Sequence, residues 1–400
     1  MLSSSSNSRA SVTIPARIPR IEGKDQTNRS LATGVALIVA AVMPGFLTAS
    51  LAPRIRADFA FGDSTLGLAV AVFYAVSALS SPPCGRLVER IGAVRGMRLT
   101  AAMTAVSCAT VAALAHSAGS LTAALLLAGV ANGMGGPTVS TLLKREVAAR
   151  RQGLAFGAQQ SGASLGALLA GLALPAVAIP FGWRWAYLGA AVLGLAAAAL
   201  APRDVARPAS GSRATPPRGL TSIHAIALAA VLASAAGVGF VSFLVSYSVK
   251  SGLDEAAAGL LLAGVSLVAT LSRVGLGLVF DRRGGEPLRP VAAMLVASVG
   301  GYLLLIAGEP VAIVVAALLA GSLGWSWPGG LTLAVVQRSP DNPAWAVGVM
   351  MSGLFAGAVA GPLLVGALAD RGAYSEAWAL CAVLALLAGV TLALTRSKPT

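Results

Sequence analysis

The octet Gly85-Arg-Leu-Val-Glu-Arg-Ile-Gly92 recurs 192 residues later as Gly277-Leu-Val-Phe-Asp-Arg-Arg-Gly284. Each copy lies between two long apolar segments, so we expect both to form short polar loops. A pattern of Gly-x-(Leu/Val)-x-acid-Arg-x-Gly that returns at half the chain length indicates an internal duplication. Its charged residues must face water between hydrophobic spans. The sequence therefore predicts a membrane protein with two related halves.

A second landmark of the duplication is a set of glycines that repeats at an offset of 191 residues. Ser161-Gly162 matches Ser352-Gly353, and the neighbouring glycines follow the same register. Spacings of four or five residues suit membrane helices that pack closely against a neighbour. The residues expected to pack in this way are Gly157, Gly162, Gly166, Gly348, Gly353, Gly357, Gly361 and Pro362.

The composition is that of a membrane protein. Apolar residues make up 56% of the 400 positions, charged residues 11%, and the mean hydropathy is +0.80. The apolar residues form blocks of about 20, the length that a helix needs to cross a bilayer. Backbone groups in lipid need internal partners, which favours helices over open strands. We predict an all-α membrane protein with twelve transmembrane helices, at 31–51, 65–82, 99–116, 120–143, 153–175, 184–201, 222–247, 256–276, 289–308, 310–335, 345–368 and 374–395.

The basic residues that give the net charge of +14 fall mainly on one side of the predicted membrane. If the chain crosses the membrane twelve times, 23 of its 29 Lys and Arg residues lie on the same side as the N-terminus and five lie on the other side. The remaining one, Arg273, lies inside a span. Such a bias marks the cytoplasmic side. We therefore expect a multi-pass protein of the cell (inner) membrane with both termini in the cytoplasm. The lipid bilayer is its partner, and nucleic acid is not.

The chain divides at a segment rich in proline and arginine. We expect a disordered cytoplasmic tail at 1–30, a six-helix bundle at 31–201, a cytoplasmic linker at 202–221, a second six-helix bundle at 222–395 and a short tail at 396–400. No apolar stretch precedes Leu31, so we expect no cleavable signal.

Nothing in the sequence indicates an enzyme. Phosphate-binding loops and the His-Glu-x-x-His motif are absent, and Cys84, Cys108 and Cys381 are too widely spaced for a metal site or a disulfide framework. We expect buried thiols, no metal and no cofactor.

With these features the chain resembles the major facilitator superfamily over nearly its whole length. The resemblance rests on the two octets, the glycine-rich fifth span behind Arg150-Arg151-Gln152-Gly153, Trp183-Arg184-Trp185, and Gly361-Pro362 before Asp370-Arg371-Gly372. It implies two pseudosymmetric six-helix bundles around a central cavity that opens alternately to each side. It also implies that the fifth and eleventh spans face the opposite half and slide during transport. The fifth span lacks the Gly-Pro pair common in drug–proton antiporters.

The octets supply candidate gating residues. An acid near a helix N-terminus is stabilised by the helix dipole, and an arginine can clamp a neighbouring helix. A clamp made in one conformation and broken in another would bias their equilibrium. The alternative is a solvated charge cluster. The candidates are Gly85, Glu89, Arg90, Gly92, Gly277, Asp281, Arg282 and Gly284.

Arg273 is the one Lys or Arg that lies inside a predicted span and not at its edge. A charge in a membrane helix is costly and marks a candidate functional site. One interpretation is that it faces the cavity and binds an anion. The other is that it reaches the cytoplasmic surface or pairs with Asp281 or Glu89. The run from Arg273 to Val279 resembles the eighth span of monocarboxylate porters, where an arginine holds the substrate carboxylate. Their acidic partner one turn earlier is replaced here by Ala269.

The other cavity candidates are uncharged, and some of them could instead join helices. Asp, Glu and His are absent from the middle of every predicted span, so a co-transported proton would have to travel on the substrate, or transport would be facilitated diffusion. Trp325-Ser-Trp327-Pro-Gly-Gly predicts a bent helix with aromatic faces. The candidates are Tyr74, Asn132, Gln159, Gln160, Tyr247, Trp325 and Trp327.

We therefore expect a monomeric transporter of a small molecule that works by alternating access. Uptake of a small organic anion through Arg273 is the first hypothesis. Efflux of hydrophobic drugs or metabolites, with the tryptophans as the binding surface, is the alternative. A sensor that has kept the fold is a third possibility, which the short tail disfavours.

Overall fold

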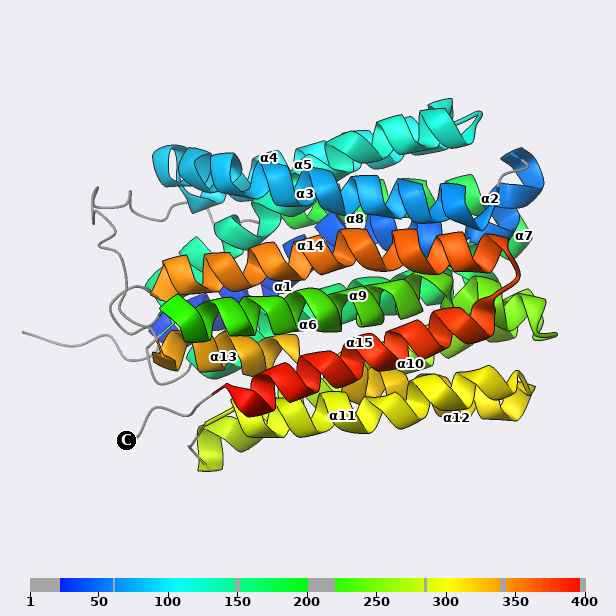
Figure 1. Cartoon of the computed structure of the whole chain (residues 1–400). Helices are drawn as coiled ribbons and strands as arrows, with labels where there is room; N and C mark the ends of the chain where they lie inside the picture. The colour runs from blue at the N-terminus through cyan, green and yellow to red at the C-terminus, as the bar shows by residue number, and fades with distance from the viewer. Residues whose placement is uncertain are drawn as a thin grey trace, which may run out of the picture.

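The computed structural model describes residues 22–59, 62–147, 152–200, 220–283, 286–338 and 343–395, and throughout these ranges each regular element is a helix (Figure 1). The elements are α1 (Glu22–Ser50), α2 (Ala52–Phe59), α3 (Asp63–Ile91), α4 (Ala93–Leu114), α5 (Ala118–Glu146), α6 (Gln152–Ala173), η2 (Leu174–Ala178), α7 (Ile179–Phe181), α8 (Trp183–Ala199), α9 (Leu220–Lys250), α10 (Glu255–Arg283), α11 (Leu288–Leu304), η3 (Leu305–Ala307), α12 (Pro310–Leu319), η4 (Ala320–Gly324), α13 (Pro328–Arg338), α14 (Pro343–Asp370) and α15 (Tyr374–Leu394). The all-α fold class is confirmed.

Most of these helices are long enough to cross a bilayer. In the described part of the chain, eleven are long and apolar enough to span it. The predicted sixth span corresponds to α8, whose 17 residues cover about 25 Å, slightly less than the hydrocarbon thickness. Together they are consistent with the twelve predicted spans.

The ends of the helices differ from the sequence prediction. Helix α1 begins at Glu22, so residues that we assigned to a disordered tail form its first two turns. A helix can continue into water because its backbone bonds are internal, and apolar composition marks only its embedded part. The predicted linker at 202–221 lies outside the described residues except for its last two positions, and so does the tail at 396–400.

Two of the spans contain a π-helical segment, and one of these two is also interrupted. The fifth consists of α6, the π-helical η2 and α7, and the tenth consists of α12, the π-helical η4 and α13. In the tenth span the helical backbone stops at Gly324, the last residue of η4, and resumes at Pro328. Pro328 has no N–H to continue a helix and suits a first helical position. The predicted bend at this segment is confirmed.

The helices lie side by side along one direction (Figure 1). Helix α1 begins and α15 ends at the same end of the bundle, which we call the terminal end. The opposite end carries α2 and the turns before α10 and α15, and we call it the distal end. Helices α3 and α6 of the first half pack against α14 and α10 of the second, which gives two seams between the halves.

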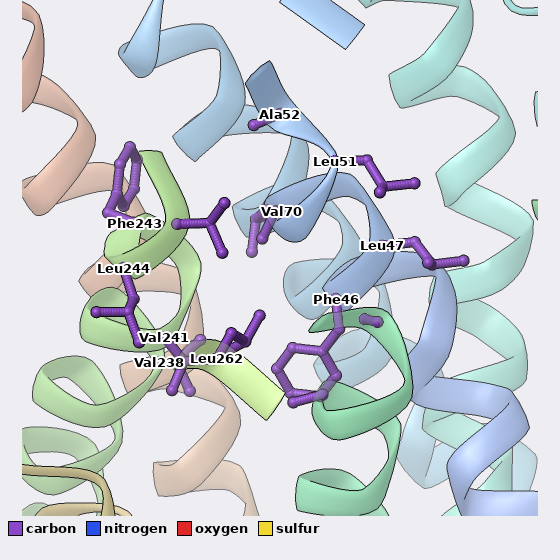
Figure 2. Close-up of a cluster of buried hydrophobic side chains, with 14 of the residues drawn as sticks. Phe46, Leu47, Leu51, Ala52, Val70, Val238, Val241, Phe243, Leu244 and Leu262 are labelled. Carbon is purple, nitrogen blue, oxygen red and sulfur yellow. The ribbon is translucent and has the colours of Figure 1, made fainter. Parts of the chain in front are cut away.

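The largest apolar core crosses from one half to the other. Figure 2 shows Phe46 and Leu47 of α1 and the following residue Leu51 in one cluster with Val70 of α3 and side chains of α9 and α10. The side chains of α9 and α10 are Val238, Val241, Phe243, Leu244 and Leu262. This cluster joins the halves near the distal end. Cys84, Cys108 and Cys381 are buried free thiols, as expected.

Candidate functional site

Arg273 is buried between the two halves. Its position in α10 is about 27 Å from the first residue of that helix and about 15 Å from the last. Only 3% of Arg273 is exposed. Its Nη1 donates to the carbonyl of Gln160 at 2.6 Å and to Ser164 Oγ at 3.3 Å, and its Nη2 donates to the carbonyl of Trp325 at 2.5 Å. The guanidinium therefore bridges α6 of one half and the broken tenth span of the other.

The break in the tenth span brings Trp325 to this position. Trp325 has φ −116° and ψ 0°, outside the helical region, and directly follows the π-helical segment. A helix end leaves carbonyl groups without helical partners, which makes them available to a side chain. The guanidinium carbon of Arg273 also lies 5.0 Å from the centre of the Trp325 ring, a cation–π contact. The same ring meets Phe46 of α1 edge to face at 5.9 Å.

The partners of Arg273 are all uncharged. Among the side chains that the structure describes, no carboxylate lies within ion-pair distance of Arg273, and its Nε is buried without a partner. A buried charge is costly unless an opposite charge compensates it. The burial also contradicts the interpretation that Arg273 reaches the cytoplasmic surface.

A short polar strip on α6 faces Arg273. Ser164 accepts a hydrogen bond from Thr270 Oγ1 at 2.9 Å and donates to the carbonyl of Ser161 at 3.1 Å. Thr270 and Arg273 are three residues apart on α10, and Gln160 and Ser164 are four apart on α6, so each pair shares one helix face. Gln160 joins the strip through its backbone carbonyl. Arg273, Gln160 and Trp325 are thus brought together, and Ser164 and Thr270, which we had not predicted, join them.

Two other candidates link helices within the first half. Asn132 Nδ2 donates to Ser77 Oγ at 2.9 Å and so connects α5 with α3. Gln159 Nε2 donates to Ser140 Oγ at 3.2 Å and connects α6 with α5. Polar side chains commonly join membrane helices in this way. These contacts agree with the structural alternative for both residues.

The remaining aromatic candidates are also packed in the core. Tyr247 donates to the carbonyl of Leu305 at 2.5 Å near the distal end. Tyr74 is 7% exposed and packs edge to face against Phe73 at 5.0 Å. Trp327 is 2% exposed and belongs to an apolar cluster of the second half. These three side chains therefore lie in different surroundings from Arg273.

The first octet is not a loop. Helix α3 continues through Ile91, and only Gly92, with φ 89°, forms the turn to α4. Glu89 and Arg90 therefore lie in the last turn of a helix, where the dipole favours the arginine and opposes the acid. The predicted N-terminal stabilisation of Glu89 is wrong. Gly85 makes only ordinary contact, since a Cβ there would lie 3.8 Å from Pro137.

The second octet shows the same pattern. Helix α10 runs to Arg283, so Asp281 and Arg282 also lie in a last turn, and the dipole argument fails for Asp281 too. A Cβ on Gly277 would meet nothing within 4 Å, so no close helix contact requires this glycine. The side chains of Glu89 and Asp281, and all of Gly284, lie outside the described residues. The gating clamp stays a prediction.

The repeated glycines pack within their own halves. A Cβ on Gly162 would lie 2.7 Å from Ile38, and one on Gly166 would lie 2.5 Å from Val42, both on α1. In the second half, added Cβ atoms would meet backbone carbonyls of α9 at 2.4 Å, 2.1 Å and 2.2 Å, for Gly353, Gly357 and Gly361 respectively. Helices α6 and α14 do face the opposite half, but these glycines hold them to α1 and α9 instead. Gly157 lies nearer the seam, where an added Cβ would be 3.9 Å from the carbonyl of Arg273, and the surroundings of Gly348 lie outside the description.

The closest glycine contacts between the halves involve glycines that we had not selected. A Cβ on Gly67 of α3 would lie 2.4 Å from the carbonyl of Pro362 in α14. A Cβ on Gly259 of α10 would lie 2.8 Å from the carbonyl of Gly171 in α6. Gly67 and Gly259 are 192 residues apart, the offset of the octets. That offset was the signal that could have identified them.

The comparisons with known proteins agree with this architecture. The sequence matches the Major Facilitator Superfamily over residues 33–342 and 228–400. It is 30% identical over 317 residues to an uncharacterised MFS-type transporter of Mycobacterium tuberculosis strain CDC 1551, covering 76% of this chain and 71% of that protein. A second such transporter, from strain H37Rv, is 29% identical with the same coverage.

Solved structures show the same fold. A bacterial homologue of the human lysosomal transporter Spinster, inward-facing and occupied, superposes with a TM-score of 0.72 at 16% identity, over 92% of this chain and 98% of that one. Its inward-facing and unoccupied form gives a TM-score of 0.71 at 16% identity, over 94% and 100%. The membrane-spanning helices, the repeat in the sequence, the match to the family and the related transporters lead to one conclusion: the chain belongs to the major facilitator superfamily of membrane transporters.

Proposed function

We propose that this transporter takes up a small organic anion of the carboxylate type, and that Arg273 recognises its charge. The observation that carries the proposal is the buried guanidinium of Arg273, which is held by neutral oxygens from both halves and lies beyond ion-pair distance of every described carboxylate. An anionic substrate would supply the missing charge.

The geometry explains how an anion could compete for this site. An arginine fork binds a carboxylate through two parallel hydrogen bonds, which are about twice as strong as bonds to neutral acceptors. A substrate carboxylate would replace the carbonyls of Gln160 and Trp325 at Nη1 and Nη2. Since these carbonyls come from different halves, the exchange would alter a contact between the halves as well as bind the substrate. Binding and conformational change would then share one residue.

The direction of the chain in the membrane follows from its charge bias. The 23 basic residues assigned to the side of the termini favour a cytoplasmic terminal end and an external distal end. We propose a monomer in the cell membrane with both termini in the cytoplasm. The proton for any symport would travel on the substrate, and otherwise transport is facilitated diffusion.

A thermal-shift screen of the purified protein tests the substrate class. The panel contains carboxylates, vitamins, nucleobases and hydrophobic cations, and each is repeated with Arg273→Ala. We expect carboxylates to raise the melting temperature of the wild type and to lose this effect in Arg273→Ala. Arg338→Ala is the matched control, because Arg338 is a mostly buried arginine that pairs with Glu286. It should keep the carboxylate response.

The efflux alternative has one observation in its favour, the aromatic pair of Phe46 and Trp325 between the halves. Aromatic faces bind hydrophobic cations. Stabilisation by hydrophobic cations that survives in Arg273→Ala and disappears in Trp325→Ala would establish this alternative and refute the anion proposal.

A further inference from the structure

Helices α3 and α10 each begin with an acid at the distal end. Asp63 is the first residue of α3 and Glu255 is the first of α10, and the two are 192 residues apart. They are thus equivalent positions of the duplicated halves. An acid at a helix N-terminus is stabilised by the helix dipole, so both carboxylates suit their positions.

Asp63 is held by both halves. It is 2% exposed, and its Oδ2 accepts from Lys250 Nζ at 2.5 Å and from the Tyr374 hydroxyl at 3.3 Å, both in the second half. Arg56 of its own half pairs with the other carboxylate oxygen and donates across the seam to Ser246 Oγ at 3.2 Å. One buried carboxylate therefore ties the end of α9 and the start of α15 to the first half.

Glu255 makes the mirror-image contact. Its Oε2 accepts from Arg54 Nε at 2.5 Å, and Arg54 belongs to the segment that follows α1. Asp63 takes its cation from the end of α9, which is the first span of the second half. Each acid therefore pairs with a cation close after or at the end of the first span of the opposite half, although Arg54 and Lys250 themselves are 196 residues apart and are not equivalent positions. Glu255 is 31% exposed and Asp63 is 2% exposed, so water screens the charge of the Glu255 carboxylate more than that of Asp63.

Two further layers lie beneath these ion pairs. Gly67 and Gly259 come one turn after the two acids and allow the close backbone contacts with Pro362 and Gly171. The apolar cluster around Phe46 then fills the space between the halves (Figure 2). Charge, backbone contact and apolar packing thus follow one another inward from the distal end.

We propose that Asp63 and Glu255 are the latch residues of a gate at the distal end. Each pairs with a cation of the opposite half when that end is closed and loses the partner when the halves separate. Asp63 is the stronger latch, because its carboxylate is buried and has two partners in the opposite half, Lys250 and Tyr374. The proposal rests on alternating access and is independent of the substrate class proposed above.

The gate can be tested without a substrate by measuring the distance between the halves. Two nitroxide labels are attached at His116→Cys and Glu309→Cys, which are exposed distal positions on different halves, after Cys84, Cys108 and Cys381 are replaced by alanine. Distance distributions are recorded by pulsed electron paramagnetic resonance in lipid nanodiscs.

We expect a short distance to dominate in the parent protein. Asp63→Asn should raise the ratio of the long-distance to the short-distance population about tenfold, and Glu255→Gln about two- to threefold, in line with the larger effect of a buried pair. Asp58→Asn is the matched control, because Asp58 pairs with Arg184 inside the first half. It should leave the distribution unchanged.

Two results would overturn the gate. One is an unchanged distribution in a folded Asp63→Asn protein. The other is an equal opening in Asp58→Asn, which would show a general effect of lost charge. If Asp63→Asn fails to fold, Lys250→Met decides, because it removes the partner from the opposite half at a residue that is 48% exposed. A distribution identical to that of the parent would then refute the proposal.

Discussion

The two seams between the halves share a backbone design and differ in their polar residues. In the α3·α14 seam Gly67 approaches the carbonyl of Pro362, and in the α6·α10 seam Gly259 approaches the carbonyl of Gly171. Both glycines lie four residues after an acid that pairs with the other half. The duplication therefore supplied the same close backbone contact twice.

The difference appears further toward the terminal end. Thr270 and Arg273 of α10 correspond to Ala78 and Ser81 of α3. The residues of α14 that correspond to Gln160 and Ser164 of α6 are Met351 and Phe355. One seam thus has a buried charge and hydroxyl groups where the other has mainly apolar side chains. This difference is consistent with the proposed function, in which the α6·α10 seam recognises the substrate and the α3·α14 seam has a packing role.

Arg273 should give the largest functional difference between the seams. With the carboxylate that stabilises the protein most, we expect Arg273→Ala to lower the initial uptake rate into proteoliposomes at least about 30-fold, because truncating a buried hydrogen-bonded charge costs roughly 2–5 kcal/mol. Arg273→Lys should restore little, since an ammonium cannot form the two parallel bonds. Ser81→Ala, at the equivalent place in the other seam, should stay within about twofold of the wild type. Equal losses at Arg273 and Ser81 would refute this division of roles between the seams.

The glycine contacts should respond alike in both seams. Gly67→Leu and Gly259→Leu each force a side chain against a backbone carbonyl, and overpacking of this kind costs about 1–3 kcal/mol. We expect both to lower the melting temperature in detergent. Gly275→Leu is the control on α10, because an added Cβ there meets nothing within 4 Å. Destabilisation by only one of the two substitutions would show that the seams are mechanically different.

The sequence predicted the features that depend on the bilayer. Span length and the need for internal backbone bonds determine the length and type of the helices. Trp325-Ser-Trp327-Pro-Gly-Gly predicted a break because proline and glycine interrupt a helix. The helix ends were predicted less well. Charged residues such as Glu89 mark the membrane surface, but α3 continues past that surface to Ile91.

The partners of side chains were the least predictable part. Arg273 was recognisable as a charge in a span, yet its acceptors at Gln160 and Trp325 are backbone carbonyls, which have no signature in the sequence. The sequence also did not show which helix Gly162 packs against. A helix in the bundle contacts helices of its own half and of the other half, and the spacing of its glycines suits both kinds of contact. Asp63 was visible in principle, since the 192-residue offset relates it to Glu255.

The hydroxyl groups of the α6·α10 seam should have a smaller effect than Arg273. Ser164→Ala with Thr270→Val removes the bond between the two hydroxyls and one acceptor of Arg273. Because neutral hydrogen bonds contribute about 0.5–1.5 kcal/mol, we expect the apparent affinity for the carboxylate to fall about three- to tenfold. Isothermal titration calorimetry measures this. The control is Thr391→Val on α15, whose exposed hydroxyl bonds only its own helix. An unchanged affinity in the double variant would exclude these hydroxyls from the site.

The smallest effect is expected for a hydrogen bond between two helices of the same half. Asn132→Ala removes the bond to Ser77 that connects α5 with α3, and such bonds in membrane proteins contribute about 0.6 kcal/mol on average. A double-mutant cycle with Ser77→Ala, measured by reversible unfolding in detergent, should give a coupling energy of that size, and the thermal response to carboxylates should persist in all three variants. Both helices of this contact belong to the same half and move together. We therefore expect its loss to reduce the stability of the protein without changing how it recognises the substrate. If Asn132→Ala abolished the carboxylate response, the substrate site would have to extend from the α6·α10 seam to α3 and α5.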